Sequence, residues 1–418
     1  MKEVERAHRE HWGTVLAATR SRVGSLDLAE DATADAFEAA LTAWPRDGVP
    51  ANPAGWLVTT ARRKALDRLR RLDTARRRLP QLAQDQWVPD PADVHADATD
   101  PDSPDAGPAW LRDDLLRLVF TCCHPALSPE ARVPLTLRLV CGLPVGDVAR
   151  VLLLAEPTVA ARITRAKQKI ADAGIAYLVP PPSELPARLD SVLTVVHAVF
   201  TAGHAAGPGT DLVRDEVTGR ALHLARELTA LLPHEPEVAG LLALLLLTQA
   251  RSGGRVGACG LPIPLEDQDR TRWDSGSIDQ GLALLRALSR RPAGRFVLQA
   301  AIAGEHARAA SFADTDWHRI VRLYDALAQE WPSPLVALNR AAARTFTDGP
   351  AAALADVDAL VAEGSLGDYP YLAASRADLL RRLGQVPQAR KAYRRAIDLT
   401  ENQPERAFLL RRLGELGG

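Results

Sequence analysis

Helical periodicity runs through almost the whole chain and limits its fold more than any other feature. Apolar residues recur at spacings of three and four, whereas alternating Val, Ile, Thr and Tyr runs bounded by turns are missing. The sequence therefore predicts an all-α fold. The chain has 418 residues, and the usual domain size of about 150 residues predicts roughly three domains.

Two stretches interrupt the helical pattern and divide the chain. Residues 79–109 carry seven Asp, several Pro and no Lys or Arg, a composition typical of a linker that forms no core. Residues 177–186 contain a run of prolines that indicates a second linker. We therefore expect helical domains at residues 1–78, 110–176 and 187–418.

The end of the last domain has the pattern of paired antiparallel helices. Ala389, Tyr393 and Ala396 have the small-aromatic-small spacing of a tetratricopeptide helix, and Pro404 follows. This spacing predicts tetratricopeptide-like pairs toward the C-terminus, with generic helical packing as the alternative.

Several features indicate a cytoplasmic protein. The first residues are charged and lack the apolar region of a secretory signal. The longest apolar stretch, Val238–Thr248, is shorter than the ~20 residues that span a bilayer, so we expect a buried helix and no membrane association. The four cysteines suggest no disulfide framework: Cys122, Cys123, Cys141 and Cys259.

Capping residues predict where the first helices begin. Asp27, with Glu30 three residues later, suits the start of a helix that runs to Pro45. A loop rich in turn formers follows. Asn52 as N-cap and Pro53 at the first helical position then begin a second helix.

That second helix is strongly basic. From Arg62 to Arg78 there are nine Lys or Arg and two Asp, a formal charge of +7. Such a stripe attracts a phosphate backbone, although a charge run on a helix is often only a solvated face. Trp56 lies at the edge of the stripe and favours nucleic acid, because an aromatic ring there can stack on an unpaired base.

Residues 137–170 predict a helix-turn-helix, with a short helix from Pro144 to about Leu152 and a basic final helix. No acidic residue lies between Pro157 and Ala171. In a major groove, Arg162 or Arg165 can bond a guanine edge while lysines neutralise phosphates. The two helices are expected to pack through Val148, Val151, Val159 and Ile163.

Together these segments resemble bacterial sigma factors of the extracytoplasmic-function (ECF) group, over about residues 1–176. Residues 29–44, AEDATADAFEAALTAW, resemble the helix that docks on the coiled coil of the polymerase β′ subunit. NPAGWLVTTARRKALDRLRR resembles the region for the promoter −10 element, and EPTVAARITRAKQKI the −35 recognition helix. The long C-terminal half resembles the extension of a subgroup that carries regulation in the same chain.

The resemblance implies a sigma factor that brings core RNA polymerase, through its β′ and β subunits, to promoter DNA without a cofactor or metal. Its implied polymerase contacts are Asp31, Asp35 and Phe37. Its implied −10 contacts are Arg46, Asn52, Trp56, Thr60, Arg62, Arg63 and Lys64. Its implied −35 contacts are Thr158, Arg162, Thr164, Arg165, Lys167 and Lys169. The extension is implied to regulate activity, through a regulatory protein or a contact within the chain.

Two features of the −35 segment depart from the family pattern. Ala160 and Ala161 stand where relatives usually carry polar or basic side chains, so fewer base contacts are expected. The turn LLLAEPT lacks the usual glycine or serine.

An enzyme would need a site, and the sequence offers only weak candidates. Residues 266–274 crowd four carboxylates, those of Glu266, Asp267, Asp269 and Asp274, with Arg270, Arg272 and Trp273. They suit a phosphate or metal site, but a salt-bridged helix start is the favoured explanation. His197 and His204 are more typical of packed histidines than of acid-base groups. Contiguous Cys122, Cys123 and His124 lack the spaced pairs of a zinc site. We expect no enzyme activity.

A regulator with one helix-turn-helix and a C-terminal domain that senses a ligand or protein is the principal alternative. Such a regulator would bind palindromic duplex DNA as a dimer. The basic helix with Trp56 would then have no function. A scaffold that binds only proteins would leave both basic helices unexplained.

Overall fold

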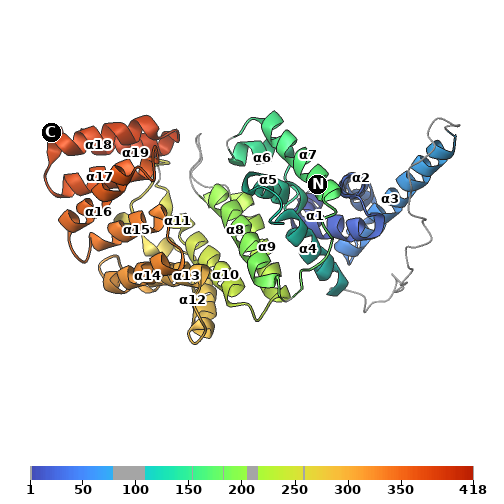
Figure 1. The fold of residues 1–418 in the computed structure, drawn as a ribbon, viewed down its shortest axis with the longest axis horizontal. Coiled ribbons are helices and arrows are strands. Elements are labelled where there is room, and N and C mark those ends of the chain that lie inside the picture. Colours follow the sequence, from blue (N-terminus) through green and yellow to red (C-terminus); the bar gives the residue numbers. More distant parts are fainter. Residues whose placement is uncertain are drawn as a thin grey trace. The chain divides into compact units, whose positions relative to one another are not determined.

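Helices form every regular element of the described residues, apart from one isolated bridge between Val256 and Pro262 (Figure 1). The computed structural model describes residues 2–78, 109–152, 154–181, 183–204, 215–257 and 259–417. The all-α prediction is therefore confirmed. Of the acidic linker predicted at 79–109, only Ala109 lies within the described residues.

The chain forms two compact units, Met1–Val195 and Val196–Gly418. The division falls inside helix α8 (Leu185–His204), shortly after the proline-rich stretch 177–186. The first turns of α8 belong to the first unit because Ser191 donates to the carbonyl of Cys123 and accepts from Arg132. The expected third domain thus shares its first helix with the preceding unit.

Among its described residues, the first unit contains seven complete helices. They are α1 (Lys2–Val23), α2 (Leu26–Asp47), α3 (Pro53–Arg78), α4 (Ala109–Cys122), α5 (Pro129–Leu139), α6 (Val145–Leu152) and α7 (Glu156–Asp172). Helix α1 is central, since it packs against α2, α3, α4 and α5.

The start of α3 is as predicted, whereas both ends of α2 differ from the prediction. Asn52 accepts a hydrogen bond from the Gly55 amide, and Pro53 is the first residue of α3. Helix α2 begins after Ser25, whose hydroxyl accepts from the Leu28 amide, so the prediction of Asp27 as cap is wrong. Pro45 lies within the last turn of α2, where a missing N–H removes only one bond before the helix ends.

Two glycines bring the helix-turn-helix segment against α1. A Cβ at Gly13 of α1 would lie 2.5 Å from the carbonyl oxygen of Val140. Gly142, at φ +69°, lies against Trp12, and a Cβ there would come within 2.5 Å of the indole. Only glycine permits contacts this close, so the sequence specifies this packing.

The helix-turn-helix consists of α5, α6 and α7, as predicted. Its two final helices pack through side chains that are at most 7% exposed: Val148, Val151, Val159 and Ile163. Their burial fixes α7 on α6 and leaves the basic face of α7 outside this core.

The second unit holds the rest of the chain. It contains the end of α8, then α9 (Asp215–Leu231), α10 (Pro236–Gln249), α11 (Ser252–Arg255), η2 (Leu265–Asp267), η3 (Arg270–Arg272), α12 (Ser275–Leu288), α13 (Arg295–Arg308), α14 (Trp317–Glu330), α15 (Pro334–Arg344), α16 (Pro350–Glu363), α17 (Pro370–Arg382), α18 (Val386–Leu399) and α19 (Gln403–Gly414). Helix α10 carries the longest apolar stretch and is buried between α9, α12 and α13, as expected.

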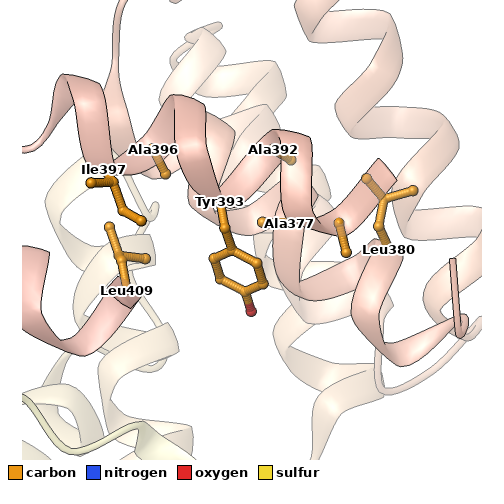
Figure 2. Close-up of a cluster of buried hydrophobic side chains, with 8 residues drawn as sticks. Ala377, Leu380, Ala392, Tyr393, Ala396, Ile397 and Leu409 are labelled. Carbon is orange, nitrogen blue, oxygen red and sulfur yellow. The ribbon is translucent and has the colours of Figure 1, made fainter. Parts of the chain in front are cut away.

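From α14 to α19 each helix packs on the next one in the chain, the arrangement of a solenoid. Each of α15 to α19 has a proline in its first turn, where the absent N–H is tolerated. Figure 2 shows Tyr393 between Leu409 and Ala377 in the last hydrophobic cluster. Ala389, Tyr393 and Ala396 are all buried there, which agrees with the predicted tetratricopeptide-like spacing.

Candidate nucleic-acid interface

Helix α3 presents its basic residues to solvent. Arg63, Lys64 and Arg71 are exposed and Arg68 is half-buried, while Leu57, Ala61 and Ala65 form the inner face. The side chains of residues 72–78 lie outside the described residues. An exposed row of cations on one helix face can follow a phosphate backbone.

Trp56 lies at the first turn of α3 and is half-buried. Its ring makes an edge-to-face contact with buried Trp44, with centroids 5.8 Å apart and an angle of 65°. Trp44 thereby supports Trp56 from the side of the core. A supported ring that is still partly exposed is suited to stack on an unpaired base.

Four other predicted −10 residues have hydrogen-bond or ion-pair partners within the first unit. Arg46 pairs with Asp47 at 2.8 Å, and Asn52 caps α3. Thr60 donates to the carbonyl of Trp56. The half-buried Arg62 donates to the carbonyl of Ala18, and burial lowers the pKa of its guanidinium. Arg62 therefore joins α3 to α1, and Thr60 bonds within its own helix. The exposed Arg63 and Lys64 are better placed for DNA.

The predicted polymerase face of α2 is partly exposed. Asp31 and Asp35 both pair with Arg68 of α3, at 2.7 and 3.3 Å. Phe37 differs from the expectation, since it is only 5% exposed. It stacks on Trp12 with centroids 5.8 Å apart, so it belongs to the core of the unit and not to an exposed apolar contact.

Helix α7 presents four of its predicted −35 residues to solvent. Thr158, Thr164, Arg165 and Lys169 are exposed, and Arg162 is half-buried. Arg165 donates only to the carbonyl of Ala161 on its own helix, which leaves the rest of its guanidinium available. These side chains have the exposure that a recognition helix requires.

Lys167 differs from the other cations of α7 because it contacts α2. Its ammonium lies 2.7 Å from a carboxylate oxygen of Asp27 and 2.5 Å from one of Glu30. Burial opposes its charge, but the two carboxylates prevail and raise the pKa of Lys167. Lys167 is therefore committed to an ion pair within the unit.

Glu30 is the functional-site residue that sequence reasoning missed. It is 8% exposed and also accepts a hydrogen bond from Arg138 of α5, so one carboxylate joins α2, α5 and α7. The sequence did contain a sign of this role. Glu30 is an acidic residue on the apolar face of α2, near the buried Ala29 and Thr33. A buried carboxylate needs such partners, because loss of one leaves an uncompensated charge.

The candidate enzyme groups are accounted for by capping and packing. Asp274 caps α12, Asp269 caps η3, and Glu266 pairs with Arg382. His197 and His204 are largely enclosed, and burial lowers their pKa values to about 4 and about 3. Both histidines are neutral near pH 7. His197 makes an edge-to-face contact with Phe296, and His204 stacks on Phe200.

The four cysteines differ in burial. Cys122, Cys123 and Cys141 are buried and Cys259 is exposed, and none of these four cysteines forms a disulfide. Burial raises the pKa of the Cys123 thiol to about 12.

Throughout the described ranges, no group of three His, Cys, Asp or Glu side chains is placed to hold a metal ion. None of the described helices has the length and apolar character needed to cross a membrane.

Three protein families match separate parts of the chain. Sigma-70 region 2 matches residues 8–75, which cover most of α1 to α3. Sigma-70 region 4 matches residues 117–170, which cover the helix-turn-helix. A family of unknown function, DUF6596, matches residues 188–289 at the start of the extension.

Relatives align over different lengths. Uncharacterized protein R00370 of Rhizobium meliloti is 40% identical over 393 residues, 94% of this chain and 90% of its own. Probable ECF RNA polymerase sigma factor SigI of Mycobacterium tuberculosis is 29% identical over 178 residues, 43% of this chain and 58% of its own. ECF RNA polymerase sigma factor SigJ of the same species is 31% identical over 141 residues, 33% of this chain and 42% of its own. No solved structure matches.

Proposed function

Because the chain belongs to the ECF RNA polymerase sigma factors and carries a C-terminal extension, we propose a specific division of labour among its helices. As a sigma factor it binds core RNA polymerase and promoter DNA. The observation that carries the residue-level proposal is the pair of basic helices, α3 and α7, each with an exposed row of cations beside a buried apolar face.

Helix α3 is proposed to hold the melted −10 element. Trp56 stacks on an unpaired base, and Arg63 and Lys64 neutralise the backbone beside it. Capture of exposed bases favours the open duplex without ATP, since each stacked base contributes ~1 to 3 kcal/mol. Trp44 supports this role because it restricts the motion of the Trp56 ring before DNA arrives.

Helix α7 is proposed to read the −35 element as duplex DNA. Arg165, with Arg162 behind it, bonds guanine edges, whereas Thr158, Thr164 and Lys169 contact phosphates. On α2, Asp31 and Asp35 are proposed to meet basic side chains of the β′ subunit, and the β subunit is proposed to receive the helix-turn-helix unit. Phe37 is left out of this surface because it is buried.

Reconstituted transcription tests the proposed residues. Purified chain and core polymerase should transcribe from the chain's own promoter, where core polymerase alone should not. Asp31→Asn with Asp35→Asn should weaken polymerase binding and leave the chain folded, because both aspartates are at the surface. The control is Glu38→Gln, also exposed on α2. Equal polymerase binding by both variants would remove the two aspartates from the interface.

The extension is proposed to regulate this activity from the same chain. Its solenoid of stacked helices is an architecture that suits a protein or ligand surface. A chain cut after Val195 retains the contacts of Ser191 with Cys123 and Arg132, which a cut near Pro186 would remove. This shortened chain should fold and transcribe with a changed yield or promoter choice. Unchanged transcription would refute a regulatory extension.

A further inference from the structure

The second unit contains a large cavity on the inner side of its solenoid. The cavity has a volume of about 730 Å³ and is lined by α15, α17 and α19. Residues 262–265, which follow α11, lie along another side. A volume of this size is typical of sites for small organic molecules.

Most charged groups at the cavity already have partners. Asp378 accepts hydrogen bonds from Arg381 and Arg382, and Arg382 also pairs with Glu266 at 3.0 Å. Glu405 accepts a hydrogen bond from the Tyr371 hydroxyl at 2.6 Å. Glu405 also lies near Arg255, so each of these carboxylates has a partner among the described residues.

Arg251 is the exception among the charged residues that line the cavity. Its side chain lies over the Trp273 ring, 5.2 Å from the centroid, and its buried Nε has no hydrogen-bond partner. Within the described residues it forms no ion pair with a carboxylate. Arg251 follows the apolar helix α10, so its charge stands at the end of the most hydrophobic element of the unit.

Among the described residues, the charged groups that act most strongly on Arg251 are two other arginines, and no carboxylate is among them. Burial, together with the nearby Arg255 and Arg270, lowers the pKa of Arg251 to about 10, which still leaves it protonated at pH 7. Arg255 donates to His204, and Arg270 donates to the carbonyls of His306 and Ala309. Both neighbours are thus satisfied. Arg251 is half-buried. A cation held partly out of water without a carboxylate partner is costly, and an anion beside it would offset that cost.

The rest of the cavity wall is mainly apolar. Ile263, Leu265, Phe346, Val357 and Leu409 all line it. An apolar wall with one uncompensated guanidinium is complementary to an amphipathic anion. We propose that this cavity binds a small organic anion whose apolar body occupies the solenoid and whose carboxylate or phosphate pairs with Arg251. The proposal concerns binding alone and does not depend on the assignment of the DNA contacts.

Calorimetric titration of the full chain with four probes of equal chain length tests the proposal. Octanoate and octyl phosphate carry the anion, 1-octanol is neutral, and octylamine is a cation. We expect the two anions to bind at one site per chain and about tenfold or more tightly than 1-octanol, because charge-assisted hydrogen bonds are the strong ones. The order of the two anions distinguishes carboxylate from phosphate. Equal binding of all four probes, or binding of none, would overturn the proposal.

Variants connect the binding to Arg251. Arg251→Gln should weaken octanoate binding about tenfold or more, whereas Arg290→Gln, an exposed arginine after α12, should not change it. Without octanoate, Arg251→Gln should melt at the same temperature as the unsubstituted chain or higher, because it removes an unpaired charge. A lower melting temperature together with unchanged octanoate affinity would assign Arg251 a structural role and refute the site.

A second variant keeps Arg251 and reduces the space. Ala342 lines the cavity from α15 and is exposed, so Ala342→Leu extends into the cavity without disturbing a packed core. This variant should fold normally and lose affinity for octanoate and octyl phosphate alike. Unchanged affinity would place the bound anion outside the cavity.

Discussion

Helices α3 and α7 both carry rows of cations, but they differ in how those cations are held. On α3 the arginine that contacts the core, Arg62, donates to a backbone carbonyl, and its neighbours Arg63 and Lys64 are exposed. On α7 the inward cation, Lys167, pairs with two carboxylates of α2. The cations of α3 beside Arg62 are thus exposed, whereas α7 also uses one of its cations for packing within the unit.

This difference follows from how the first unit is assembled. Helix α3 belongs to the three-helix body formed with α1 and α2, and Arg63 and Lys64 are exposed on it. Helix α7 reaches α2 through Glu30, which joins it to α5 as well. A charge that stabilises the packing of regions 2 and 4 is not available to phosphate at the same time.

The largest expected effect comes from the glycine that brings the helix-turn-helix segment against α1. Gly142→Ala places a methyl group against Trp12 and requires a left-handed alanine, so we expect a loss of about 3 kcal/mol in the free energy of unfolding of the first unit. Calorimetry should show one transition lowered by about 6 to 12 °C.

Gly174 provides a matched control for this substitution. It also has a positive φ, +56°, but a Cβ there would meet nothing within 4 Å. Gly174→Ala should therefore cost only the backbone strain, about 1 kcal/mol. Equal costs for the two variants would mean that Trp12 and Gly142 are not in contact in solution.

The next largest effect is expected for single-stranded DNA, which we propose is bound by α3 and not by α7. Trp56→Ala should weaken binding of the complex with core polymerase to a single-stranded −10 element by ~1 to 3 kcal/mol. Leu66→Ala, at an exposed apolar position further along α3, should leave that affinity unchanged. Competition with single-stranded oligonucleotides measures both variants. A loss confined to duplex DNA would contradict the stacking role.

Arg165→Ala addresses the −35 helix in the same way. We expect duplex −35 binding to weaken by ~1 to 3 kcal/mol at fixed salt, with loss of preference at one base pair. Arg22→Ala, an exposed arginine on α1, controls for the change in net charge. Anisotropy measurements on labelled duplexes report the affinity, and an unchanged value would exclude Arg165 from base contacts.

Local patterns in the sequence were sufficient for much of the fold and part of the site. Asn52 and Pro53 predict the start of α3, and Val148 and Val159 predict the packing of the helix-turn-helix, because capping and helical spacing act over a few residues. The start of α2 was assigned to Asp27 because Ser25 and Asp27 are both good caps, and only the backbone geometry decides between them.

Contacts between distant residues could not be predicted from such patterns. Lys167 and Glu30 are 137 positions apart, and a lysine on a basic helix is expected to be solvated until its neighbours are known. Phe37 lies among the implied polymerase contacts, yet Trp12 and His8 from α1 cover it. Arg251 gave no signal in the sequence either, since its proposed role depends on the lack of a carboxylate partner among the described residues of the folded unit.

The smallest expected effect tests the comparison of the two helices most directly. Each phosphate contact contributes about 0.9 to the slope of log affinity against log salt concentration. Lys169→Ala should therefore reduce the slope for duplex −35 DNA by about that amount, because Lys169 is exposed. Lys167→Ala should leave the slope unchanged while Asp27 and Glu30 hold its charge. Asp27→Asn combined with Glu30→Gln should release Lys167 and increase the slope by about 0.9. If Lys167→Ala alone reduces the slope as much as Lys169→Ala does, the ion pairs open on DNA, and α7 binds phosphate with both lysines, as we propose for the exposed cations of α3.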